Sequence, residues 1–250
     1  MPKLMELSYE KHGELKLDPS AFIQFASSQH LLNIRVNEVA STLCDFPVFF
    51  NKNLQSGYWN LSAVTSFEMG SNLFVENNQW QAVYRPSSIL SYPFYLMNSG
   101  EDEKKYLLGV DESNSVLSQT KGESLFDSNG QPTEILKRIK NNLKADIRND
   151  IQTMQFGQVL QDLELLKPIN LIIRYQDQNQ HTLTGLNSIN EDQLHSLSDA
   201  QLGELNRRGY LTPIHGILLS ISQLNGLIQK NNKRNTNAQI QSIKLEVNKS

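Results

Sequence analysis

Residues 44–96 alternate short apolar runs with turn-forming residues, and this pattern constrains the fold more than any other in the chain. The runs hold both tryptophans and many aromatic and β-branched residues, which favour strands. They are Phe46–Phe50, Tyr58–Val64, Leu73–Val75 and Trp80–Tyr84. Turn-forming residues, among them the Asn77-Asn78 pair, separate the runs. The stretch therefore predicts an antiparallel β meander at the centre of the fold.

A helical period replaces this pattern from Thr133 onward. Apolar residues recur every three or four positions as far as Leu166, which predicts either a helical hairpin or one long kinked helix over 133–166. A similar period predicts a C-terminal helix over 212–229, and alternation around the turn Asp177–Gln180 predicts a strand hairpin over 170–185. We therefore expect an α+β fold in which strands from 46–110 and 170–185 form one mainly antiparallel sheet, covered by the helical hairpin and the C-terminal helix.

The chain of 250 residues, 38% of them apolar, is long enough to form one large domain. We expect residues 1–230 to form a single α+β domain and residues 231–250 to form a polar linker with a strand-like tail. In that tail, Ile243, Leu245 and Val247 alternate with polar residues, as in an edge strand that lacks a partner. The tail could pair with that of a second copy, which would give a homo-oligomer.

Charge and hydropathy exclude several classes of function. The net charge of −3 and the isoelectric point near 6.0 argue against nucleic-acid binding, which needs a concentrated basic surface. The one basic cluster, at residues 137–148, is interrupted by Asp146 and followed by Asp150, so we expect a solvated helix face. The N-terminus has no apolar core of a signal peptide, and the apolar cluster 214–221 is shorter than the ~20 residues of a membrane span. We therefore expect a cytoplasmic protein with no membrane span.

Patterns of catalytic or metal-binding residues are absent from the sequence. The histidines lack the short spacings of zinc ligands, and the single Cys44 is expected to be a small buried apolar residue. Asp111 and Glu112 are adjacent at the end of an apolar strand, so they point to opposite faces and cannot act as a facing acid/base pair. We predict no catalytic residue, no metal and no cofactor.

The aromatic stretch provides the first candidates for ligand binding. They are Trp59, Trp80, Tyr84, Arg85 and Tyr92. Aromatic rings beside an arginine suit the recognition of a planar ligand or a peptide, although rings on a meander more often belong to a core.

Two further residues, Arg35 and His215, are candidates with structural alternatives. Arg35 lies near His30 and Glu38, so it could contribute to a polar site or form an ion pair at a strand edge. His215 stands beside Gly216 near the start of an apolar helix, where a buried histidine satisfied by one hydrogen bond is commoner than a ligand-binding one.

The amino-acid sequence of the aromatic stretch resembles that of the bacterial SapC family, which is named for a gene associated with a surface-layer system. The resemblance rests on FPVFF at 46–50, SAVTSFEMGSNLFVENNQW at 62–80, YRP at 84–86 and SYPFYL at 91–96. It extends more weakly to 125–130, 183–186 and 209–220, and it departs from the family at 65–67, where glycine and small residues are more usual. The name is shared with an unrelated permease of a peptide transporter. The resemblance implies a link with surface layers but no reaction.

Two functions remain open at this level. The first is a non-enzymatic cytoplasmic binding or accessory protein that recognises a peptide, a protein or a small ligand, linked to the assembly or uptake of surface components. The alternative is an enzyme, or the partner of one, with a polar pocket near His215 or Arg35. The lack of a readable nucleophile–base pair favours the first function.

Overall fold

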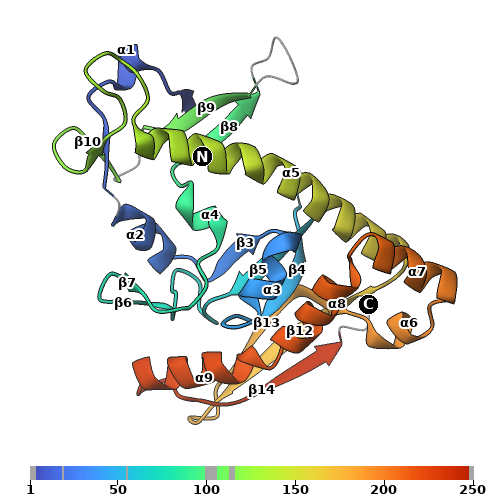
Figure 1. The fold of residues 1–250 in the computed structure, drawn as a ribbon. Coiled ribbons are helices and arrows are strands. Elements are labelled where there is room, and N and C mark those ends of the chain that lie inside the picture. The colour runs from blue at the N-terminus through green and yellow to red at the C-terminus, as the bar shows by residue number, and fades with distance from the viewer. Residues whose placement is uncertain (1–3, 19, 55, 99–105, 113–115, 248–250) are drawn as a thin grey trace. The chain divides into compact units, whose positions relative to one another are not determined.

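A computed structural model describes residues 4–18, 20–54, 56–98, 106–112 and 116–247. The chain divides into two compact units, each assembled from two separate segments. Unit 1 comprises residues 1–26 and 87–148, and unit 2 comprises residues 27–86 and 149–250. The long helix α5 (Glu134–Asp162) begins in unit 1 and ends in unit 2 (Figure 1). The expected domain of residues 1–230 therefore includes parts of both units.

Unit 1 contains two small sheets and several short helices besides the first half of α5. Its strands are β1 (Leu4–Glu6), β2 (Lys16–Leu17), β8 (Phe94–Asn98), β9 (Tyr106–Asp111), β10 (Leu117–Ser118) and β11 (Glu123–Ser124). Its helices are α1 (Tyr9–His12), α2 (Ala21–Ser27) and α4 (Ser87–Leu90). The sheet orders are β1-β9-β8 and β10-β2-β11, all antiparallel.

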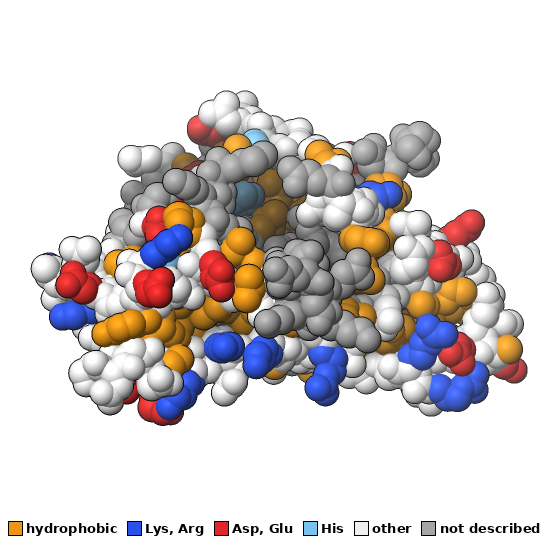
Figure 2. Space-filling view, turned by 90° about the horizontal axis from the view of Figure 1, so that it is seen from above, with side chains coloured by type: hydrophobic (Ala, Val, Ile, Leu, Met, Phe, Trp, Pro, Cys, Tyr) orange, Lys and Arg blue, Asp and Glu red, His pale blue; other side chains and the backbone are white. Residues whose placement is uncertain are grey.

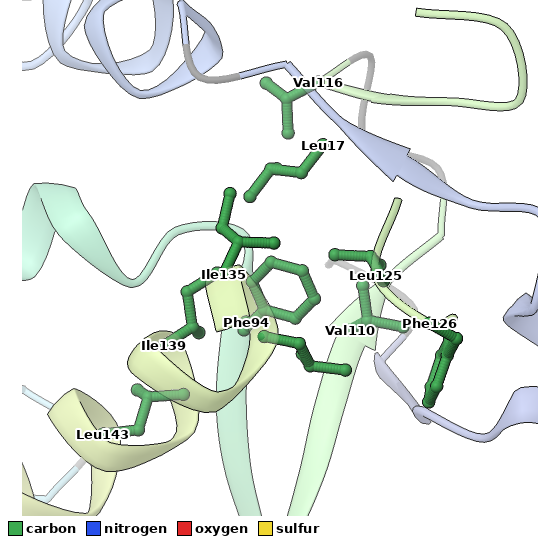
Figure 3. Packing of buried hydrophobic residues seen from close by; sticks show 10 residues of the cluster. Leu17, Phe94, Val110, Val116, Leu125, Phe126, Ile135, Ile139 and Leu143 are labelled. Atoms are coloured by element: carbon green, nitrogen blue, oxygen red, sulfur yellow. The ribbon is translucent and has the colours of Figure 1, made fainter. Parts of the chain in front are cut away.

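An apolar cluster joins these pieces of unit 1. Phe94 and Val110 come from the hairpin β8–β9, and Ile135 and Ile139 project from α5 toward them (Figure 3). All four side chains are buried. The three-and-four spacing of the first half of α5 is thus explained by burial against β8–β9.

Unit 2 is built on a six-stranded antiparallel sheet with the order β14-β12-β13-β4-β5-β3. Its strands are β3 (Leu31–Ile34), β4 (Val48–Lys52), β5 (Trp59–Val64), β12 (Leu166–Tyr175), β13 (Gln180–Ile189) and β14 (Ile240–Val247), with a separate hairpin of β6 (Val75–Glu76) and β7 (Gln79–Trp80). Its other helices are η1 (Val36–Glu38), α3 (Val39–Thr42), α6 (Glu191–His195), α7 (Asp199–Arg207), α8 (Leu211–Ser220) and α9 (Gln223–Arg234). Helix α8 packs on β13 and β4, and α9 packs on β14.

Close packing holds α8 against α3. A Cβ atom on Gly216 would lie 3.0 Å from Cγ1 of Val39, so no larger residue fits there without movement. The buried Ser220 hydroxyl accepts a hydrogen bond from the Val48 amide at 2.9 Å and donates one to the Ile217 carbonyl at 2.6 Å, which ties the end of α8 to β4. Gly216 and Ser220 therefore serve packing.

The predicted α+β class is confirmed, with 38% helix and 29% strand. Both predicted hairpin turns are confirmed as well. Asn77 and Asn78 have φ of 50° and 56° between β6 and β7, and Gln178 has φ of 69° between β12 and β13. Tight hairpin turns require such left-handed values, which asparagine tolerates and which Gln178 also adopts here.

Several expectations about the elements are wrong. The single main sheet over 46–110 does not form, because β9 pairs with β1 on one side and with β8 on the other in a separate sheet. Of the two alternatives for 133–166, the structure has one long helix and no helical hairpin, and this helix ends at Asp162. The predicted C-terminal helix is interrupted between Ser220 and Gln223, which separates α8 from α9.

The meander and the tail also differ from expectation. Only β4 and β5 of the predicted meander join the main sheet, and the return strand β7 ends at Trp80. The strand-like tail is β14, and it finds a partner within the chain, because it pairs antiparallel with β12. Residues 231–234, expected to begin a linker, are the last turn of α9.

The basic cluster of α5 is a solvated helix face, as predicted. Its members Lys137, Arg138, Lys140, Lys144 and Arg148 are all exposed. Lys137 also forms an exposed ion pair with Glu134 at 2.8 Å. Figure 2 shows basic side chains spaced among neutral and acidic ones on the face that it presents.

Helices α8 and α9 span the stretch Leu211–Arg234, which by length and composition could cross a membrane. This is weak evidence, because the core helix of a globular protein passes the same test. Ile214 and Ile217 of α8 are fully buried inside unit 2, whereas Leu219 is 66% exposed.

Candidate functional site

A cleft of about 550 Å³ lies in unit 2 and brings together three segments that are distant in the sequence. Its lining residues are Val36, Asn37 and Ala40 from η1 and α3, Gln152 and Gln155 from α5, and Arg208, Gly209, Tyr210, Thr212 and Pro213 from the corner between α7 and α8. A cleft of this volume is within the range of small-molecule sites. The lining offers three carboxamides, two hydroxyls and one guanidinium.

Val36, Asn37 and Ala40 form the first wall of the cleft, and hydrogen bonds to α5 hold it in place. The Val36 amide donates to Oγ1 of Thr153 at 2.9 Å, and Nε of Arg35 contacts Oδ1 of Asp150 at 2.8 Å. Both partners lie in the second half of α5, one turn apart, so η1 is held along that helix. This attachment places η1 beside the part of α5 that carries Gln152 and Gln155.

A buried carboxylate stabilises the same wall from behind. Glu38 is 6% exposed, and its Oε2 accepts the Arg35 amide at 2.8 Å while its Oε1 accepts the Tyr84 hydroxyl at 2.6 Å. The Tyr84 amide donates to Oδ2 of Asp45 at 2.8 Å, and Nε1 of Trp80 donates to the Tyr84 carbonyl at 2.8 Å. The network therefore connects the loop after β7 to η1 and α3.

The second wall is the corner between α7 and α8. Gly209 has φ of 72°, the left-handed conformation of a residue that ends a helix, and its amide donates to the Asn206 carbonyl at 2.9 Å. The Tyr210 ring packs edge-on against Phe156, with 4.9 Å between the centroids, and Phe156 contacts Phe50 in the core. Tyr210 is thus anchored in the core and half-buried where it lines the cleft.

Charge at this corner is unbalanced in favour of the cations. Glu204 pairs with Nε of Arg208 at 2.6 Å and with Arg207 at 2.7 Å, so one carboxylate faces two guanidinium groups. The hydrogen bond from Arg208, followed by that from Arg207, lowers the pKa of Glu204 below its usual value, so this carboxyl stays ionised. Since no carboxylate is among the residues that line the cleft, its one charged lining group is positive.

The predicted site residues lie in several places. Arg35, Trp80 and Tyr84 belong to the Glu38 network behind the first wall, where Arg35 forms the structural ion pair foreseen as an alternative. Arg85 is exposed. Tyr92 belongs to unit 1, where its ring stacks on Phe25 with 3.6 Å between the centroids.

Trp59 and His215 also lie outside the residues that line the cleft. Trp59 packs on α5, and its Nε1 donates to Oε1 of Gln161 at 2.7 Å. His215 is exposed, so the expectation of a buried histidine is wrong: it falls between the buried Ile214 and Gly216 on the side of α8 that faces away from the core. Cys44, also expected to be buried, is exposed.

Asp111 is the last residue of β9, and Glu112 lies in the turn that follows it. Asp111 is buried in unit 1. Oε1 of Glu112 lies 2.6 Å from Nε2 of His12, which is also buried. Only 2% of the His12 side chain in this pair is exposed, so a substrate could not reach the ring. Within the described part of the chain, no group of three or more His, Cys, Asp or Glu residues is arranged to hold a metal ion.

Comparison with known proteins gives one match. The model of the SapC family matches residues 7–227, which is most of the chain. The chain belongs to the SapC family. Among curated proteins and among solved structures, nothing matches. The matched region of this SapC-family chain includes every residue that lines the cleft, and it ends before β14.

Sequence reasoning missed the cleft residues because each of them looks ordinary in its own segment. Gln152 and Gln155 occupy exposed positions of a helix, and Asn37 is an exposed residue between Val36 and Glu38. The one local signal was Arg208-Gly209-Tyr210, because a glycine at this place is typical of the residue that follows a helix, and α7 ends at Arg207. Corners between helices that carry an arginine and an aromatic residue would have been the place to look.

Proposed function

We propose that this protein is a non-enzymatic binding protein and that the cleft of unit 2 holds its ligand. The supporting observation is the set of lining groups, in which carboxamides, hydroxyls and one guanidinium surround a volume of about 550 Å³. Such groups donate and accept hydrogen bonds without being suited to proton transfer near neutral pH. The lining contains no histidine, cysteine or carboxylate, which is why binding is preferred to catalysis.

The lining also indicates which ligands the cleft suits. Asn37, Gln152 and Gln155 can each donate and accept, as the hydroxyl groups of a saccharide or the amides of a peptide require. Arg208 adds one positive charge, which favours a neutral or singly negative ligand over a cation. Val36, Ala40 and Pro213 supply apolar contact. We therefore propose a small polar ligand, neutral or singly anionic, of the size of a disaccharide or a short peptide.

The link to surface components, implied by the family resemblance, narrows the candidates. Saccharide and peptide fragments of the cell surface have the size and polarity just described, and we propose these as the first ligands to test. The enzyme alternative would need a reactive group in the cleft. Arg35 is instead engaged with Glu38 and Asp150, and His215 is exposed on α8.

Native mass spectrometry of protein purified from its own host tests this proposal. We expect a retained mass of a few hundred daltons on the wild type, of the order that a cleft of this size accommodates. Ala40 is an exposed residue of α3 that lines the cleft, so Ala40→Leu fills volume without disturbing the core and should remove the retained mass. The matched control is Ala200→Leu at an exposed position of α7 that does not line the cleft.

Either of two results would overturn the proposal. Retention of the same mass by Ala40→Leu would place the ligand elsewhere. The second is a wild type that carries no ligand and whose melting temperature is unchanged by saccharides and peptides at millimolar concentration, since bound ligands stabilise the folded state by mass action.

A further inference from the structure

Strand β14 is the terminal strand of the six-stranded sheet of unit 2, so one of its two edges has no strand partner in the described part of the chain. It is eight residues long, whereas β3 at the opposite edge has four. At its first residue, Ile240, the amide and the carbonyl are already bonded to the side chain of Asn232, at 2.7 and 2.9 Å. The edge available to another strand therefore begins after Ile240.

The apolar face of the sheet continues onto this strand. Ile243, Leu245 and Val247 are in register with Ile173, Leu171 and Ile169 of β12, and residues paired across strands share a face. The three β12 side chains are buried, yet Leu245 is 38% exposed and Val247 is 54% exposed. Apolar side chains that are half covered at the edge of a long strand are typical of a surface that another strand extends.

The sequence of β14 is complementary to itself. When two copies of the strand run antiparallel with Leu245 opposite Leu245, Ile243 of each copy faces Val247 of the other on the apolar face. On the opposite face, Lys244 of each copy faces Glu246 of the other, which gives two cross-strand pairs of opposite charge. Shifting the register by one pair in either direction instead sets Lys244 opposite Lys244 or Glu246 opposite Glu246.

We propose that β14 joins the β14 of a second copy of this chain in that register, so that the sheets of two unit 2 domains form one continuous sheet. The proposed partner is a second copy, because apolar residues and opposite charges are paired at the same time only when two copies of the strand pair with Leu245 opposite Leu245. Within one chain, Lys244 already contacts Glu246 at 2.6 Å. In the dimer, each side chain turns to the neighbouring copy. Five paired residues form a small interface, so the dimer is expected to be concentration-dependent.

Charge exchange between Lys244 and Glu246 tests both the dimer and its register. Lys244→Glu places two glutamates opposite each other, and Glu246→Lys does the same with two lysines, so each single variant should be monomeric. In a mixture of the two variants, every cross-strand pair is again of opposite charge, so a heterodimer should form. The double variant Lys244→Glu/Glu246→Lys should dimerise as the wild type does.

Sedimentation equilibrium over about 5–200 μM, which brackets micromolar dissociation constants, is the measurement. Both side chains are exposed and their ion pair within the strand contributes little to stability, so the single variants should fold, and circular dichroism verifies this. The expected result is a dissociation constant raised at least tenfold in each single variant and restored in the mixture and in the double variant. A wild type that stays monomeric throughout overturns the proposal, as do single variants that dimerise like the wild type.

Discussion

Replacing Tyr84 by phenylalanine removes one hydroxyl and tests whether Glu38 organises the first wall of the cleft. The hydroxyl donates to Oε1 of Glu38 at 2.6 Å, and that carboxylate is 6% exposed. A hydrogen bond to a charged group contributes about 1.5–3 kcal/mol, and a buried acceptor that loses its donor keeps its desolvation cost. We therefore expect Tyr84→Phe to lower the free energy of unfolding by about 2 kcal/mol, out of a typical total of roughly 5–15 kcal/mol.

Urea unfolding followed by tryptophan fluorescence is the assay. Both tryptophans, Trp59 and Trp80, lie in unit 2, so the signal reports on the unit that contains the Glu38 network. In a thermal scan, a loss of this size corresponds to a fall in melting temperature of about 4–8 °C for a chain of this length. The control is Tyr58→Phe, because the Tyr58 side chain is 51% exposed and its change should stay within about 0.5 kcal/mol.

A double-mutant cycle with Glu38→Gln then isolates the contact. If the two groups stabilise each other, the cycle should give a coupling of about 1 kcal/mol or more, in the range measured for residues in contact. The reasoning is refuted if Tyr84→Phe unfolds at the same urea concentration as the wild type with the same slope. Glu38 would then be solvated or satisfied without the tyrosine.

Three further perturbations follow from the same unit. Trp80→Ala should lower the free energy of unfolding by about 3 kcal/mol, the low end for a large aromatic residue, because the ring is half-buried. If the variant keeps the wild-type melting temperature but loses a ligand, Trp80 is a recognition residue instead. Gly157→Ala should destabilise the protein, since its Cβ would lie 2.8 Å from Cβ of Trp59. In Gly203→Ala of α7, the new Cβ would meet only the flexible end of Arg207 at 3.5 Å, so this variant should be more stable by about 0.5–1 kcal/mol. Changes of equal sign in the free energy of urea unfolding would contradict this. Burial lowers the pKa of His30, so the folded state binds this proton less tightly than the unfolded chain does, and stability should fall as pH drops below about 6.5. His30→Gln should flatten that part of a stability–pH profile, and an unchanged slope would exclude His30 as its source.

Local patterns predicted the elements of this fold better than their assembly. The period of α5 and the turns at Asn77-Asn78 and Gln178 depend on neighbours in the chain, and these were predicted correctly. β8 and β9 belong to a different sheet from β4 and β5 because β9 pairs with β1, which precedes both strands by almost ninety residues or more. No local pattern encodes a pairing over such a distance.

The candidate site was less predictable than the fold for a related reason. Trp80 and Tyr84 were selected as candidates for ligand binding, but Nε1 of Trp80 donates to the Tyr84 carbonyl and the Tyr84 hydroxyl donates to Glu38. The cleft requires residues near positions 37, 152 and 208 to meet, and each of these segments is locally unremarkable. His215 was misjudged because a helix with a broad apolar stripe still leaves single positions on its outer side.

The alternation of the two units along the chain has a consequence for biosynthesis. The ribosome releases the first part of unit 1, then the first part of unit 2, and the rest of unit 1 through residue 148 only afterwards. Until β13 has been made, β4 lacks a neighbour on one side, and its unpaired backbone is exposed on the nascent chain. Neither unit can be expressed as one uninterrupted fragment. A truncated gene would therefore encode an incomplete core of each unit and a complete core of neither.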